Sequence, residues 1–244
     1  YIMTSDENND ETVEFFEKNN YFDYPKEAVK FFIQGEMPMI NTEGKILLNE
    51  EGLIKQAGAG HGAIFEAMRK NGIIYEMCIR DRVKMVDPVL IGLSIERNVL
   101  AAGKSVVKAN PHEKVGVFCK KDGKPSVIEY SEISNELAEA VDEKGELLFG
   151  ESHILCNQFN IKILEELAKN KLPYHVAFKK ATYMDEKGNI ISPTEPNAYK
   201  FEAFIFDAFS SIPEMLVMRV KREEEFAPVK NAEGVDSPET ARKL

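Results

Sequence analysis

Short apolar runs alternate along the chain with segments in which apolar side chains recur at helical spacing. Buried strands are predicted at residues 1–5, 28–33 and 215–220, where apolar residues are nearly consecutive. Helices are predicted where apolar residues recur every three or four positions, at residues 9–22 with Asn9-Asp10 as the cap, 63–68, 161–168 and 201–208. This alternation is typical of the α/β class with a mixed sheet.

Two hairpins are predicted as insertions in this pattern. The runs at residues 115–119 and 126–130 are joined through Asp-Gly at positions 122–123, and Asp-Gly between apolar runs is a strong signal for a two-residue turn. A second hairpin is expected over residues 37–48, with Gly44 at its turn.

Composition narrows the class of protein. The chain has 244 residues, 43% of them hydrophobic and 30% charged, which is enough for a sizeable core. No stretch approaches the roughly 18 apolar residues of a membrane span. The 41 acidic against 31 basic residues give a net charge of −10 without a dense basic block, which argues against a nucleic-acid partner. The three cysteines form neither a disulfide framework nor a zinc pattern, which favours a reducing, cytoplasmic location.

Both ends of the chain predict an internal fragment. Residues 1–5 read as the end of a strand and do not begin with Met, and no signal-peptide core is present. Residues 238–244 resemble the start of a helix without a terminating signal. We therefore expect a fold that is incomplete at both ends.

Three local features could carry chemistry. The Gly-rich loop at residues 58–62 precedes a helix, where backbone N–H groups can hold a phosphate or a sugar oxygen, although such loops also serve as plain turns. Lys200 and Lys230 lie beside apolar segments and could neutralise phosphates, or they could be solvated surface lysines. Residues 129–132 offer two carboxylates and two hydroxyls to a sugar. The histidines show no metal-ligand spacing and no catalytic triad.

Several segments, in this order, resemble signatures of the UDP-N-acetylhexosamine pyrophosphorylase family of uridylyltransferases. They are Met3-Thr4-Ser5, Phe31-Phe32-Ile33-Gln34-Gly35, Gly44-Lys45-Ile46, Glu129-Tyr130-Ser131-Glu132-Ile133, Phe204-Ile205-Phe206-Asp207 and Glu225-Phe226-Ala227-Pro228-Val229-Lys230-Asn231-Ala232. The resemblance covers nearly the whole chain apart from one break. It implies a Rossmann-like nucleotidyltransferase fold of the GT-A kind, with one partial catalytic domain over residues 1–244.

The implied reaction is transfer of uridylyl from UTP to N-acetylglucosamine 1-phosphate, which gives UDP-N-acetylglucosamine and pyrophosphate with Mg²⁺. The sugar phosphate attacks in line, so catalysis would consist mainly of positioning and charge neutralisation. Two alternatives stay open. One is a uridylyltransferase for glucose 1-phosphate or a broader set of sugar phosphates, and the other is a non-catalytic protein that binds nucleotide sugars.

The resemblance also implies roles for individual residues. Gln34 and Gly60 match residues that hold the uracil, and Lys200 matches the lysine that contacts the UTP phosphates. The sugar-phosphate site would comprise His61, Gly116, Glu129, Tyr130, His153, Phe204, Phe206 and Lys230. Lys200 and Lys230 are the catalytic candidates, and no metal ligand is assigned.

The chain departs from the family pattern at two histidines and at one segment. His61 and His153 stand where the family has Asn, and the Gly-His-Gly form resembles the glucose 1-phosphate relatives, so the sugar remains open. Residues 78–82, Cys-Ile-Arg-Asp-Arg, replace a Val-Asp-Asn strand and resemble translated adapter sequence. The expected Asp falls on Ile79, and we interpret this segment as a sequence artefact.

The family's Gly-rich, Arg-bearing nucleotide loop would lie upstream of Tyr1. We therefore predict that the isolated 244-residue chain is inactive, and measurable pyrophosphate release from the purified chain would contradict this.

Overall fold

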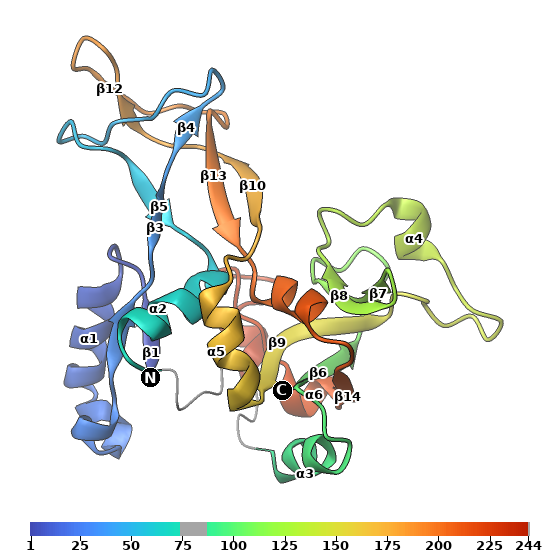
Figure 1. Ribbon diagram of the computed structural model, residues 1–244. Helices are drawn as coiled ribbons and strands as arrows, with labels where there is room; N and C mark the ends of the chain where they lie inside the picture. Colours follow the sequence, from blue (N-terminus) through green and yellow to red (C-terminus); the bar gives the residue numbers. More distant parts are fainter. Residues whose placement is uncertain (74–86, 244) are drawn as a thin grey trace. The chain divides into compact units, whose positions relative to one another are not determined.

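A computed structural model describes residues 1–73 and 87–243 (Figure 1). The break predicted at residues 78–82, including Ile79, lies outside the described residues. The chain forms two compact units. Unit 1 comprises Tyr1–Ile74 and Glu165–Ala208, and unit 2 comprises Tyr75–Leu164 and Phe209–Leu244.

Unit 1 is built from small sheets joined by short helices. Three sheets have two strands each: β1 (Ile2–Thr4) is parallel to β2 (Phe31–Ile33), β3 (Glu36–Pro38) is antiparallel to β5 (Gln56–Gly58), and β11 (Tyr183–Met184) is antiparallel to β12 (Ile190–Ile191). The fourth sheet has three antiparallel strands in the order β10 (Tyr174–Lys179), β13 (Ala198–Ala203), β4 (Ile40–Asn41). The helices are α1 (Asn9–Lys18), η1 (Asn20–Asp23), η2 (Lys26–Ala28), η3 (His61–Ala63) and α2 (Ile64–Lys70). Met39, Leu47, Ala181 and Ala198 form one buried cluster.

Unit 2 contains a five-stranded mixed sheet. The order is β14 (Leu216–Arg219), β6 (Ala101–Val107), β9 (Glu151–Phe159), β7 (Val117–Lys121), β8 (Lys124–Ile128), in which β14 is parallel to β6 and the other pairs are antiparallel. The helices are α3 (Pro88–Glu96), α4 (Asn135–Glu139), α6 (Arg222–Glu225) and α7 (Pro238–Arg242). Val106, Ile154, Cys156 and Phe226 form its buried cluster.

Two further helices lie at the points where the chain passes between the units in sequence. They are α5 (Ile161–Lys169) and the 3₁₀ helix η4 (Ile205–Ser211). Among the described residues, no helix has both the length and the apolar character that a membrane span requires.

The mixed α/β architecture and the local signals are confirmed. Asp122 and Gly123 have φ angles of 52° and 77°, so the β7–β8 hairpin turns through two left-handed residues, as a type I′ turn requires. The turn ending at Gly44 is also present, because the side chain of Asn41 accepts from the backbone N–H groups of Glu43 and Lys45. Helices α2, α5 and α7 form where predicted, and Ser237 closes a capping box on α7.

Other expectations were wrong. Residues 201–208 are not one helix, because Phe201 belongs to β13 and pairs with Val176, and only the segment from Ile205 onwards is helical. Asn8, not Asn9-Asp10, occupies the N-cap of α1, and the helix ends before Phe22. The strands predicted as buried are only partly so, because β1 and β2 form a two-stranded sheet and β14 lies at a sheet edge.

Candidate functional site

The Gly-rich loop of unit 1 lies against the end of β13. Gly60 has a φ of 85°, and a Cβ there would stand 2.6 Å from the carbonyl oxygen of Ala203. The N–H of Ala203 donates to the oxygen of Ala59 at 2.7 Å, which ties loop and strand together. The loop conformation therefore needs glycine both for its backbone angle and for the close approach.

Gln34 lies beside the loop that contains Gly60, the other residue predicted to hold the uracil. A Cβ on Gly58 would stand 2.7 Å from Nε2 of Gln34, so the amide fills the space that a larger residue at position 58 would need. Oε1 of Gln34 is buried and accepts no hydrogen bond from any described residue. A buried acceptor without a donor is costly, so this oxygen is suited to a ligand N–H.

Lys200 lines a cleft of unit 1. The cleft has a volume of about 990 Å³ and also includes Gly58. The ammonium group of Lys200 lies 3.0 Å from a carboxylate oxygen of Glu202, and both side chains are about three-quarters buried. Burial and the nearby Asp6 and Glu7 raise the pKa of Glu36 on the same cleft. The cleft therefore brings the lysine predicted to contact phosphates to the same hollow as the loop.

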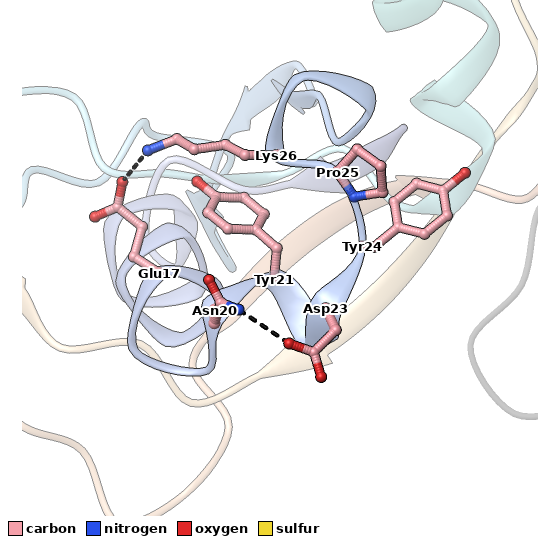
Figure 2. Close-up of a pocket in the computed structure, with 7 residues that line it drawn as sticks. All are labelled: Glu17, Asn20, Tyr21, Asp23, Tyr24, Pro25 and Lys26. Carbon is pink, nitrogen blue, oxygen red and sulfur yellow. Dashed lines mark hydrogen bonds and ion pairs between the residues drawn. The ribbon is translucent and has the colours of Figure 1, made fainter.

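A second hollow of unit 1, of about 460 Å³, contains none of the predicted site residues (Figure 2). It is formed by the turn after α1 and includes Tyr21, Tyr24 and Lys26, with Lys26 paired to Glu17 at 3.1 Å. No chemistry follows from these groups.

Aromatic rings gather around the end of the loop. The ring of His61 stacks on Phe204 with centroids 5.2 Å apart, and it lies 5.9 Å from Phe206. The two phenylalanine rings are 5.1 Å apart. Nδ1 of His61 accepts from the backbone N–H of Ile205 at 3.0 Å. Three sugar-site candidates of unit 1 are thus brought together.

Burial lowers the pKa of His61 from 6.5 to about 4, against the opposing effect of Glu202, and repulsion from His175 adds to the lowering. The imidazole is therefore neutral at pH 7. Because Nδ1 accepts a hydrogen bond, the proton lies on Nε2. His61 thus offers one acceptor that is already used and one donor, as an asparagine side chain also can.

Two residues that the sequence did not single out complete this cluster. His175, on β10, lies 4.4 Å from the ring of Phe204, and its Nε2 is 2.9 Å from Oδ2 of Asp207. Asp207 is part of the Phe204–Asp207 motif, so that motif gave a signal, but His175 stands in no recognised motif.

In unit 2, the sugar-site candidates gather around Gly116. A Cβ on Gly116 would stand 3.0 Å from Oε1 of Glu129. The backbone N–H of His153 donates to the oxygen of Gly116 at 2.8 Å. Tyr130, which follows Glu129, is 48% exposed. The ammonium group of Lys230 donates to the carbonyl of Lys114 at 3.1 Å, two residues before Gly116.

His153 is buried, and its ring lies against one polar side chain and two phenylalanine rings. Its Nε2 lies 3.0 Å from Oδ1 of Asn157, and its ring meets Phe118 edge-on at 4.8 Å. Leu155, between the two polar residues, has a φ of 58°, and this left-handed residue directs both side chains to one place. His153, which stands where the family resemblance implies Asn, therefore has a polar neighbour in Asn157.

The predicted residues thus form one group in each unit. Gln34, Gly60, His61, Lys200, Phe204 and Phe206 belong to unit 1, and Gly116, Glu129, Tyr130, His153 and Lys230 belong to unit 2. Over residues 1–73 and 87–243, no three His, Cys, Asp or Glu side chains come together as metal ligands.

The model of the UTP–glucose-1-phosphate uridylyltransferase family matches residues 1–235. The chain belongs to this family. Its curated relatives include the UDP-N-acetylglucosamine pyrophosphorylase of Saccharomyces cerevisiae, 38% identical with 99% of this chain and 55% of the relative covered. The human UDP-N-acetylhexosamine pyrophosphorylase-like protein 1 is 37% identical, with 99% and 51% covered. The chain spans about half the length of the curated relatives it matches.

Solved structures of related proteins share the fold of this chain. A UDP-N-acetylglucosamine pyrophosphorylase from Trypanosoma brucei, solved with an inhibitor, is 32% identical with a TM-score of 0.79, covering 99% of this chain and 52% of that one. A chain from Entamoeba histolytica, also 32% identical, has a TM-score of 0.85, with 98% of this chain and 63% of that one covered. UDP-glucose pyrophosphorylases from Leishmania major, at 17% identity, show the same fold.

We predict that His61 makes the stability of unit 1 depend on pH. The unfolded state gains a proton near pH 6.5, whereas the folded state gains it only near pH 4, so stability is lost as the pH falls between these values. The full difference is roughly 3 kcal/mol. Urea unfolding at pH 7, 5.5 and 4.5 should show a steeper loss for the natural chain than for His61→Asn. Parallel pH profiles would contradict the assignment.

Proposed function

We propose that this chain is part of a uridylyltransferase that forms UDP-N-acetylglucosamine and pyrophosphate from UTP and N-acetylglucosamine 1-phosphate. The observation that carries the proposal is an arrangement in unit 1. The Gly-rich loop lies against the side chain of Gln34, whose Oε1 accepts no hydrogen bond from a described residue, and Gly58 of this loop lines the same cleft as Lys200. Family membership supports the same reaction class.

In this reaction, a phosphate oxygen of the sugar phosphate forms a bond to the α-phosphorus of UTP. The bond from that phosphorus to the bridging oxygen breaks, and pyrophosphate leaves with the electron pair. No covalent nucleophile is needed, and the protein contributes orientation and positive charge.

In this proposal, each group of residues binds a different part of the substrates. Oε1 of Gln34 accepts from the uracil N3–H, and the loop around Gly60 lets the base approach the backbone. Lys200 neutralises charge on the UTP phosphates, and Lys230 neutralises the sugar phosphate. The sugar is held by His61, Gly116, Glu129, Tyr130, His153, Phe204 and Phe206.

The choice of sugar rests on the relatives. Those at 37–38% identity carry names for UDP-N-acetylglucosamine or UDP-N-acetylhexosamine, whereas the UDP-glucose pyrophosphorylases match at 17% and show only the fold. Glucose 1-phosphate is the second candidate, favoured by His61 in a Gly-His-Gly loop. A comparison of the two sugar phosphates in one assay of the complete protein separates these candidates.

Mg²⁺ belongs to the proposal only through the family resemblance. The described residues gather no set of three metal ligands, so no step is derived through the ion. A cytoplasmic location is proposed from the free thiols of Cys119 and Cys156, and the net charge of −10 supports a protein that does not bind nucleic acid.

We expect Lys200→Met to weaken UTP binding by the 244-residue chain roughly tenfold or more, because a charged hydrogen bond is worth about 1.5–3 kcal/mol. Isothermal titration with UTP measures this. Lys187→Met is the matched control, since Lys187 is exposed in the β11–β12 turn of the same unit. Equal affinities for Lys200→Met and the natural chain would remove Lys200 from the phosphate site. A complete protein that binds neither UTP nor UDP-N-acetylglucosamine would overturn the proposed function.

A further inference from the structure

Phe204 of unit 1 lies against two imidazole rings. His61 lies 5.2 Å from its centroid with the planes 23° apart, and His175 lies 4.4 Å away with the planes 32° apart. Stacked rings at such distances attract one another and restrict each other's rotation. The orientation of Phe204 therefore depends on what fixes the two histidines.

Each histidine is held by a different residue of the segment Phe204–Asp207. Nδ1 of His61 accepts from the N–H of Ile205 at 3.0 Å. Nε2 of His175 lies 2.9 Å from Oδ2 of Asp207, and because a carboxylate only accepts, the nitrogen carries the proton. Both side chains of this second pair are about three-quarters or more buried, so water competes little for the contact.

The second pair joins a strand to the segment that bears the aromatic rings. His175 belongs to β10, and Asp207 belongs to η4, one residue after Phe206. Removing the contact would take away one restraint on the orientation of the imidazole, and the plane of the stack on Phe204 would change with it.

We propose that His175 and Asp207 form a positioning pair that sets the ring plane of Phe204 in the sugar pocket. The inference rests on the proposed function for the identity of the pocket, but the positioning itself rests on the contacts within unit 1. His175 acts through Phe204, and Asp207 acts through His175.

An acid–base role for this pair is not needed by the chemistry. The attacking group is a phosphate monoester, whose second proton is lost near pH 6, so its oxygens are already mostly ionised at neutral pH. Pyrophosphate leaves as an anion without requiring a proton. A histidine–carboxylate pair beside an aromatic wall therefore serves orientation and not proton transfer.

The test compares Asp207→Ala, Asp207→Asn and His175→Gln in the 244-residue chain with labelled phenylalanine. The Phe204 ring signals are assigned from their loss in Phe204→Leu. Asp207→Ala should shift these signals and weaken UDP-N-acetylglucosamine binding about fivefold to tenfold, with UTP binding changed less than twofold. Asp207→Asn should largely restore both, because its amide oxygen still accepts from Nε2 of His175. His175→Gln should weaken UDP-N-acetylglucosamine binding as Asp207→Ala does, since the imidazole stack is lost.

His112→Gln is the matched control, because His112 pairs with Glu139 at 2.7 Å on the exposed surface of unit 2. It should leave the Phe204 signals and both affinities unchanged. Unmoved Phe204 signals in Asp207→Ala, or equal weakening of UTP and UDP-N-acetylglucosamine, would overturn the positioning role. So would an Asp207→Asn variant that behaves like Asp207→Ala. If the complete protein binds no nucleotide sugar, the proposed function fails, and the ring signals of the 244-residue chain still decide whether the pair positions Phe204.

Discussion

Replacement of Lys104 by Met is expected to destabilise unit 2 by roughly 3–5 kcal/mol. This is a large part of the free energy of unfolding of a typical domain, which is about 5–15 kcal/mol. Lys104 is fully buried on β6, and its ammonium nitrogen lies 2.7 Å from Oδ2 of Asp87 and 2.9 Å from Oε1 of Glu225. The hydrogen bond from Lys104 is the main cause that lowers the pKa of Asp87. Without the lysine, both carboxylates would lose their shared counter-charge.

The loss would reach the predicted phosphate-binding segment, because Glu225 begins the motif that contains Lys230. Urea unfolding of Lys104→Met, followed through the amide NMR signals of β6 and β9 in unit 2, measures the change. Lys144→Met, at an exposed turn, is the control and should stay within about 0.5 kcal/mol of the natural chain. Adding Asp87→Asn and Glu225→Gln to Lys104→Met should recover part of the loss, because neutral amides are less costly to bury. A shift below about 1 kcal/mol for Lys104→Met would show that water or other groups satisfy the carboxylates.

The features that the sequence predicts well are those whose cause is local. The Asp122-Gly123 turn needs two left-handed residues in succession, and only a few dipeptides allow this at low cost. Helix α5 follows from the spacing of Ile161, Leu164 and Leu167 within the segment. In both cases, the residues that determine the structure are the residues that adopt it.

Other elements depend on partners that lie far away in the chain. Phe201 fits a helical spacing, but its segment pairs over six residues with β10, and this ladder outweighs the local pattern. The turn at Asn20–Asp23 places four consecutive residues at positive φ although none is glycine, so composition gave no signal for it.

The candidate site shows the same division. Motif resemblance pointed to Phe204 and Lys230, which stand inside recognisable strings of residues, and to Lys200, which lies four residues before one of them. His175 and Lys104 were missed, because their partners are 32 and 121 positions away in sequence. Such side chains become visible only when folding brings the separate strands together.

Gly62→Ala is expected to destabilise unit 1 by roughly 2–3 kcal/mol, the upper part of the usual range for overpacking. Gly62 is buried, and a Cβ at this position would stand 2.7 Å from the carbonyl carbon of Ala203 and 2.8 Å from the backbone nitrogen of Phe204. These neighbours are backbone atoms, so they cannot move aside by changing a rotamer. The chain must shift where β13 ends and the aromatic cluster begins.

This shift should be visible in binding as well as in stability. Because Phe204 would move with its backbone, UDP-N-acetylglucosamine affinity should fall along with the urea midpoint. Gly35→Ala is the control in the same unit, since a Cβ there meets nothing within 4 Å and the residue needs no left-handed backbone. That variant should be neutral or slightly stabilising, because alanine reduces the freedom of the unfolded chain. If Gly62→Ala unfolds at the same urea concentration as Gly35→Ala, the loop does not pack against β13 as closely as the distances indicate, and the aromatic cluster would need another anchor.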